Sequence, residues 1–229
     1  MKMQAKPLIA SIYMDNVDPD LRNYQRETIK TVTFGTGMKT LQYKASDHAR
    51  GMDQVMRQAE ESGFTQVLFF DIDAIPLNFD AVMWLLVRGL DGLAGNLQRS
   101  NHIDNGSHLF VAPSCMCLTI ETYKLLGRPS FAATSRGDVG EELTYLAEGL
   151  QLPINFLEPL RYEASPIEAE YWQTAFPYRN FGCQTTFGLI DHGSEAKTET
   201  EMTYHAFQIR HGRNRDAFIK RCKQILNHA

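Results

Sequence analysis

Hydrophobic residues recur along this chain in two spacings, one typical of buried strands and the other of helices. Residues 67–70 read Val-Leu-Phe-Phe, a continuous apolar run that indicates a strand buried on both faces. Further upstream, Met52, Val55 and Met56 lie on one face at helical spacing. Gly63 follows this helix where a C-terminal cap belongs. The two patterns together predict a chain that alternates strands with helices.

Other segments continue this alternation. We expect strands over 7–14, 40–46, 93–98 and 154–160. We expect helices over 21–32 and 81–87, and three further helices: one that ends near residue 126, one that begins at 137–142 and one around 218–226. Strands and helices at this spacing predict an α/β fold with a mostly parallel central sheet and flanking helices. Ligands of such sheets bind outside the carboxyl ends of the strands. Residues 161–203 have no clear periodicity and predict no element.

Two aspartates directly follow the central apolar run, in the order Asp71-Ile72-Asp73. Pro76 then ends the strand, because proline cannot donate to a sheet ladder. Buried ionised carboxylates are costly unless they are paired or bind a metal. Hard divalent ions such as Mg²⁺ and Mn²⁺ prefer such oxygen ligands. The pair therefore predicts a divalent-metal site, and the alternative is that Asp71 and Asp73 are loop residues that cap Asn78 and the next helix. Asn78 itself is a good N-cap for the helix expected over 81–87.

Composition narrows the class of protein. A chain of 229 residues can bury one sizeable core, and we expect a single domain over 1–229. The net charge of −4 argues against nucleic acid as the main partner. No apolar run approaches eighteen residues, so no transmembrane segment is expected, while peripheral contact with a membrane stays open. The four cysteines lack zinc-site spacing and disulfide density, and the start of the chain lacks the apolar core of a signal peptide. A cytoplasmic location is expected.

The order of these features resembles a known family. A first strand and a helix beginning near 46–52 precede the Asp71-Ile72-Asp73 motif, and the apolar stretch 110–114, an acidic helix start and His205 follow it. This arrangement resembles that of the GT-A-fold glycosyltransferases, which use nucleotide-diphosphate sugars. The resemblance covers most of the chain, and Asp71-Ile72-Asp73 is its specific motif.

The resemblance implies a metal site and a reaction. Asp73 would bind Mn²⁺ or Mg²⁺ directly, Asp71 would serve the ribose or a metal-bound water, and His205 would be a further metal ligand. His192 and His211 are alternatives to His205, and a structural histidine is an alternative at each position. The reaction would move a sugar from a nucleotide-diphosphate sugar to a hydroxyl of a glycan or another acceptor, with inversion.

The general base of an inverting member is an Asp or Glu at the start of an acidic helix. Here that implies Asp138 first, and Glu141 or Glu142 second. The alternative is structural, because Asp138 followed three residues later by Glu141 fits a capping box.

The donor nucleotide would lie at the end of the first strand, with Ser11 and Tyr13 and with His48 nearby. Packing is the alternative role for Tyr13. Arg210 and Arg213 belong to a basic cluster with His211 and Arg215. Arginine matches phosphate oxygens bidentately, so the cluster fits a diphosphate clamp, and a solvated helix start is its alternative.

Two other classes of protein remain open. A haloacid-dehalogenase-type phosphatase also places Asp-x-Asp after an apolar strand, but that motif normally sits on an early strand and continues with Gly-Thr. Here the motif follows about seventy residues and continues Ala74-Ile75-Pro76. A non-catalytic nucleotide-binding or scaffold protein is the second alternative.

Overall fold

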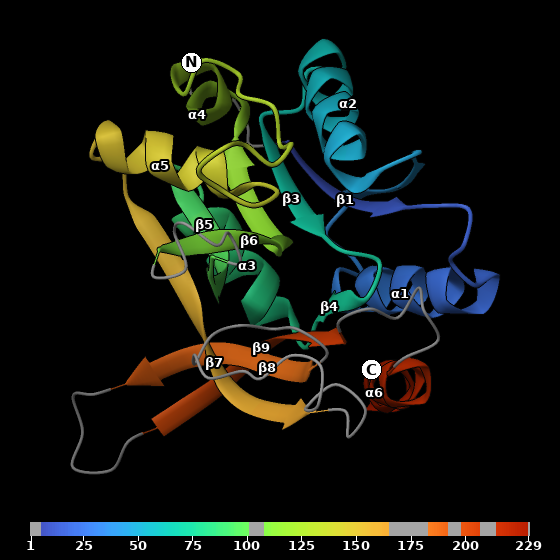
Figure 1. Cartoon of the computed structure of the whole chain (residues 1–229). Coiled ribbons are helices and arrows are strands. Elements are labelled where there is room, and N and C mark those ends of the chain that lie inside the picture. Colours follow the sequence, from blue (N-terminus) through green and yellow to red (C-terminus); the bar gives the residue numbers. More distant parts are fainter. Residues whose placement is uncertain (1–5, 101–107, 165–182, 192–197, 207–213, 229) are drawn as a thin grey trace.

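The structure is a computed structural model, and it describes residues 6–100, 108–164, 183–191, 198–206 and 214–228 (Figure 1). The strands are β1 (Pro7–Tyr13), β2 (Lys39–Lys44), β3 (Gln66–Phe70), β4 (Ala74–Pro76), β5 (Leu93–Arg99), β6 (Leu109–Thr119), β7 (Ile154–Ala164), β8 (Cys183–Asp191) and β9 (Thr198–Ala206). The helices are α1 (Pro19–Val32), α2 (His48–Glu61), α3 (Phe79–Arg88), α4 (Ile120–Leu125), α5 (Glu141–Gly149) and α6 (Arg215–His228).

The described strands form one sheet in the order β2-β1-β3-β6-β5-β7-β8-β9-β4. β1 pairs in parallel with β2 and β3, and β5 pairs in parallel with β7, whereas the remaining neighbours are antiparallel. The predicted α/β fold with flanking helices is therefore confirmed. The prediction that the sheet is mostly parallel was wrong, because β6 enters between β3 and β5 in the opposite direction and β8 and β9 form an antiparallel hairpin.

The long strand β7 joins two parts of the sheet. Its residues 154–157 pair with β5, and its residues 158–164 pair with β8. In Figure 1 it descends from the level of α5 to the β8–β9 hairpin in the lower part of the molecule. Much of this hairpin comes from residues 161–203, for which the sequence predicted no element. β7 is also longer than the strand expected over 154–160.

Helix α2 packs tightly on β1. Met52, Val55 and Met56 are fully buried, as their helical spacing predicted. Gly51 is required at this contact, because a Cβ there would lie 2.4 Å from Ile12 Cγ2. The close approach holds the start of α2 against β1, near the carboxyl end of that strand.

Helices α1 and α6 lie side by side, with α1 in contact with β4 and α6 in contact with β9 (Figure 1). Phe218 and Cys222 of α6 are buried in one cluster with Leu21 of α1 and Ile75 of β4. On the other side, Asn78 caps α3 as predicted, since its side chain accepts the Ala81 N–H at 2.8 Å. Among the described helices, none combines the length and apolar character needed to cross a membrane.

Candidate metal centre

The Asp-x-Asp segment is a tight turn between β3 and β4. All five residues of β3 are buried, and the strand ends where the Asp71 N–H donates to the Ser114 carbonyl at 3.1 Å. The Ala74 N–H then donates back to the Asp71 carbonyl at 2.9 Å. Since both ends of the turn are hydrogen-bonded, the backbone positions of the two aspartates are fixed.

Strand β9 brings a histidine to this turn. Its antiparallel pairing with β4 sets His205 opposite Ala74, and the Ala206 N–H donates to the Asp73 carbonyl at 2.8 Å. The register therefore places His205 beside Asp73, although the two are far apart in the sequence. The alternatives His192 and His211 lie outside the described residues.

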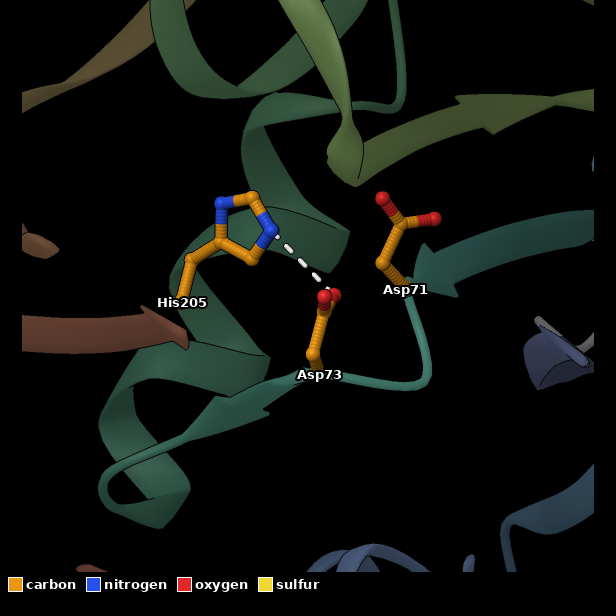
Figure 2. Close-up of side chains that lie close together, drawn as sticks. All are labelled: Asp71, Asp73 and His205. Carbon is orange, nitrogen blue, oxygen red and sulfur yellow. Dashed lines mark ion pairs between the residues drawn. The ribbon is translucent and has the colours of Figure 1, made fainter. Parts of the chain in front are cut away.

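Asp71, Asp73 and His205 form a compact group, and Figure 2 shows the Asp73 carboxylate pointing toward the imidazole with Asp71 beside it. His205 Nε2 lies 3.2 Å from Asp73 Oδ1, and one ligand atom from each residue lies within 4.8 Å of the others. His205 is 2% exposed and Asp73 is 8% exposed. Two carboxylates and an imidazole are a donor set for a divalent cation, and the burial of the Asp73 carboxylate makes a compensating positive charge favourable.

The charge balance of the group appears in the pKa of His205. Burial by itself lowers this pKa, but the negative charge of Asp73, its hydrogen bond to the ring and the charge of Asp71 outweigh burial. The result is a pKa above the ordinary histidine value. Without a metal, the two carboxylates therefore favour the protonated form of the His205 ring.

A buried glutamine of α1 supports the turn from behind, and sequence reasoning missed it. Gln25 is fully buried, and its Nε2 contacts Ser11 Oγ at 2.8 Å, the Asp71 carbonyl at 2.8 Å and the Ala74 carbonyl at 3.2 Å. Its helical spacing from Leu21 and Ile29 placed it on the buried face of α1. A polar residue on that face was the signal that could have found it.

A series of buried side-chain hydrogen bonds also reaches the turn, from β5 and β9. The Thr203 hydroxyl donates to Asn96 Oδ1 at 2.6 Å, and the Asn96 amide donates to Ser114 Oγ at 3.2 Å. The carbonyl of the same Ser114 accepts the Asp71 N–H. These hydrogen bonds therefore link β9, β5 and β6 to the first aspartate.

The three residues predicted at the nucleotide lie near the carboxyl end of β1. His48 Nε2 forms an ion pair with Asp71 Oδ1, which ties the start of α2 to the turn. The Ser11 hydroxyl is buried and in contact with Gln25. Tyr13 is partly exposed, and the guanidinium of Arg22 lies 4.5 Å from its ring centre.

The acidic helix start has a different cap from the expected one. The N-cap of α5 is Gly140, in a left-handed conformation at φ 77°, so the structural alternative, in which Asp138 caps this helix, does not hold. Half of the expected capping box is present, because Glu141 Oε2 accepts the Asp138 N–H at 2.7 Å. Asp138 Oδ1 instead accepts the Val139 N–H at 2.7 Å. The left-handed Gly140 separates Asp138 from the first turn of the helix.

The three predicted acidic residues have unequal surroundings. Glu141 is fully buried, with Ser100 Oγ at 2.8 Å and His108 Nδ1 at 2.6 Å from its carboxylate. Glu142 pairs with the Arg136 guanidinium, which lowers the pKa of its carboxyl group. Asp138 is partly exposed.

Asp138 belongs to a turn that lies close to the strand segment supporting Asp71. A Cβ added to Gly140 would lie 3.5 Å from Pro113 Cδ, and Pro113 precedes the Ser114 whose carbonyl holds Asp71. The sequence from Asp138 to Gly140 is therefore near the carboxyl end of β3.

The basic cluster is described only at its last member. Arg210, His211 and Arg213 lie outside the described residues. Arg215 bonds Asp18, with Nε and Nη2 each 3.0 Å from Asp18 Oδ2. This pair connects the starts of α1 and α6.

Comparisons with known proteins give structural neighbours only, since no protein-family model and no curated protein matches the sequence. One neighbour is a protein assigned as a nucleotide-diphospho-sugar transferase from Desulfovibrio desulfuricans G20, with 10% identity, TM-score 0.44 and coverage of 68% of this chain and 80% of that one. Another is a glycosyltransferase involved in glycosylation of the major capsid of PBCV-1, with 10% identity, TM-score 0.42 and coverage of 66% and 80%.

A third neighbour is the galactosyltransferase LgtC in complex with donor and acceptor sugar analogs, with 9% identity, TM-score 0.41 and coverage of 74% and 78%. The chain thus resembles structures of the class that the Asp-x-Asp motif predicted, and it has the expected Asp-x-Asp-His group.

Proposed function

We propose that this protein is a metal-dependent glycosyltransferase that moves a sugar from a nucleotide-diphosphate sugar to an acceptor hydroxyl. The observation that carries the proposal is the group Asp71, Asp73 and His205, whose ligand atoms lie within 4.8 Å of one another at the carboxyl end of the buried strand β3. Ligands bind at such strand ends in α/β sheets, and a diphosphate is a natural partner for a carboxylate-held divalent ion.

Each member of the proposed site has a part in the reaction. Asp71, Asp73 and His205 would hold Mn²⁺ or Mg²⁺, which supplies positive charge for the departing nucleoside diphosphate. His48 would orient the Asp71 carboxylate through their ion pair. The nucleotide would lie over the carboxyl end of β1, near Tyr13 and Ser11, with Arg210 and Arg213 as candidates for phosphate contact.

The acceptor side of the proposal rests on Asp138. Its carboxylate would take the proton of the acceptor hydroxyl as the oxygen attacks the anomeric carbon from the face opposite the leaving group, which gives inversion. Asp138 is favoured over Glu141 because Glu141 is fully buried and bonded to Ser100, His108 and the Asp138 N–H. It is favoured over Glu142 because the latter is held by Arg136.

The decisive experiment is a screen of nucleotide-diphosphate sugars for turnover with Mn²⁺, with Mg²⁺ and with EDTA. We expect at least one donor to release its nucleoside diphosphate only when metal is present. The release should be slow when water accepts the sugar and faster when an acceptor hydroxyl does. Metal-dependent release of phosphate from simple monoesters, with no turnover of any nucleotide sugar, would instead favour the phosphatase alternative. Metal-dependent nucleotide binding without turnover of any substrate would favour the non-catalytic alternative.

A further inference from the structure

The backbones of the two aspartates in the candidate metal centre are hydrogen-bonded to different parts of the fold. The Asp73 carbonyl accepts the Ala206 N–H, so the backbone of Asp73 is tied to β9, the strand that carries His205. The backbone of Asp71 is bonded to other elements: its N–H donates to the Ser114 carbonyl of β6, and its carbonyl accepts from the Ala74 N–H and from Gln25 of α1. These bonds therefore help to set the distance from Asp71 to Asp73 and His205.

The orientation of the Gln25 amide follows from its partners. The carbonyls of Asp71 and Ala74 can only accept, so the nitrogen of Gln25 faces them. The oxygen of Gln25 faces the other way and accepts from Gln42 Nε2 at 2.9 Å. Gln42 in turn also donates to the Arg22 carbonyl at 2.8 Å. The Gln25 side chain thus bonds both ends of the Asp71–Ala74 turn, and β2 fixes the side chain from behind.

From these contacts we propose that Gln25 is a positioning residue of the metal centre, which fixes Asp71 relative to Asp73 and His205. The inference rests on the metal centre of the proposed function. Gln25 lies behind the turn and bonds its main chain, so it acts through Asp71. Partners that orient metal ligands from outside typically change metal affinity ten- to hundredfold, roughly, when they are removed.

The test measures Mn²⁺ affinity from the electron paramagnetic resonance signal of free Mn²⁺, with no nucleotide sugar present. We expect Gln25→Leu to bind Mn²⁺ roughly tenfold more weakly than the wild type. The wild-type affinity must also be lost in Asp73→Asn, so that the measured site is this one. Because the readout is binding of the metal alone, it does not depend on finding the donor sugar.

Gln66→Leu is the matched control. Gln66 is also a buried glutamine, and its Nε2 donates to the Leu86 carbonyl at 2.7 Å. It lies at the opposite end of β3, five residues or roughly 16 Å along the strand from Asp71. Losing either glutamine leaves a buried carbonyl without this donor, so both variants should lose stability. We expect only the Gln25 variant to lose Mn²⁺ affinity.

Gln42→Leu gives a second, milder variant at a partly exposed position. It should shift Mn²⁺ affinity in the same direction by a smaller factor, and it decides the question if Gln25→Leu does not fold. Unchanged affinity in the folded variants, or an equal loss in Gln66→Leu, would overturn the positioning role alone. A wild type that binds no Mn²⁺ would overturn both this role and the proposed function. Weakened Mn²⁺ binding with no sugar transfer in any assay would support the role and reject the transferase.

Discussion

At the scale of single residues, Asp73 gives the most direct test of the candidate metal centre. Its carboxylate lies 3.2 Å from His205 Nε2 and is largely buried. Asp73→Asn keeps the size of the side chain but removes its charge. Mn²⁺ binding should weaken by at least the roughly hundredfold that losing an outer-shell partner can cost. Titration calorimetry with Mn²⁺ measures this effect.

The matched control is Asp80→Asn, which changes an exposed aspartate in the first turn of α3. It should bind Mn²⁺ like the wild type. Full Mn²⁺ affinity in Asp73→Asn would show that this carboxylate is not a ligand and would remove the observation on which the proposed function rests.

Asp138 tests the acceptor side of the same reaction. Asp138→Asn retains an oxygen that can accept the Val139 N–H, so the turn before α5 should keep its shape. The amide cannot take a proton at neutral pH. General-base assistance is typically worth about a hundred- to ten-thousandfold in rate, so turnover should fall at least a hundredfold while Mn²⁺ and donor binding stay unchanged.

Steady-state kinetics with a saturating donor, together with the stereochemistry of the product, check this prediction. Glu142→Gln is the comparison, and its loss of activity should be only a few-fold. A retained anomeric configuration, or equal activity of Asp138→Asn and the wild type, would refute the assignment of Asp138 as base.

At the scale of elements, the sequence predicted those that carry their own local signal. β3 is a continuous apolar run, α2 has a regular buried face, and α3 begins at a good N-cap. β4 has only three residues, which is too short to show a period, and it exists because it pairs with β9. The pairing of β4 with β9 joins residues about 130 positions apart, and no local pattern encodes such a contact.

Some residues of the candidate site could likewise be predicted from a local sequence signal, and others could not. Asp71 and Asp73 could be predicted because two carboxylates after a buried strand are chemically conspicuous. His205 was reached through the family resemblance, and the register of β9 explains its position. Gln25 could not be assigned a role, since its partners at the turn are main-chain carbonyls, which leave no trace in the sequence.

Glu141 of α5 is bonded to Ser100, which follows β5, and to His108, which precedes β6. These bonds should make the stability of the protein depend on pH. Burial lowers the pKa of His108, but Glu141 and Glu148 outweigh it and raise this pKa above its ordinary value. Burial raises the pKa of Glu141, but its bonds to His108, Asp138 and Ser100 prevail and lower it. The His108 contribution is therefore complete below the unfolded histidine pKa and disappears as pH rises through the folded one. The Glu141 contribution disappears as pH falls through its lowered pKa.

His108→Gln should thus cost the most stability at roughly pH 5 to 6, between the ordinary pKa values of the two groups. The cost should shrink at a pH well above the raised pKa of His108, where the imidazole is neutral in both states. Urea unfolding of the variant and the wild type at both pH values measures the difference in the free energy of unfolding. His228→Gln, at an exposed histidine at the end of α6, should show no such pH dependence. A cost that is constant with pH would mean that His108 contributes by packing on Tyr145, since the two rings are stacked with their centres 3.8 Å apart.

At the scale of the whole molecule, the proposed site joins parts of the chain that are distant in sequence. Asp71 and Asp73 follow β3, His205 lies on β9, His48 begins α2 and Gln25 belongs to α1. A ligand that binds across these elements binds only the native state. It therefore raises the free energy of unfolding of the whole chain.

We expect a nucleoside diphosphate and Mn²⁺ together to raise the Tm of the wild type, and neither the nucleotide with EDTA nor the nucleotide with Asp73→Asn to do so. At a ligand concentration a hundred times its Kd, the gain is about 2.7 kcal/mol, which corresponds to roughly 5 to 10 °C for a chain of this size. Differential scanning fluorimetry with several nucleoside diphosphates measures the shift and identifies the preferred base. An equal shift with EDTA would show that the nucleotide binds away from the metal centre. An equal shift with inorganic phosphate and Mg²⁺ would mean that the site selects phosphate alone, as the phosphatase alternative requires.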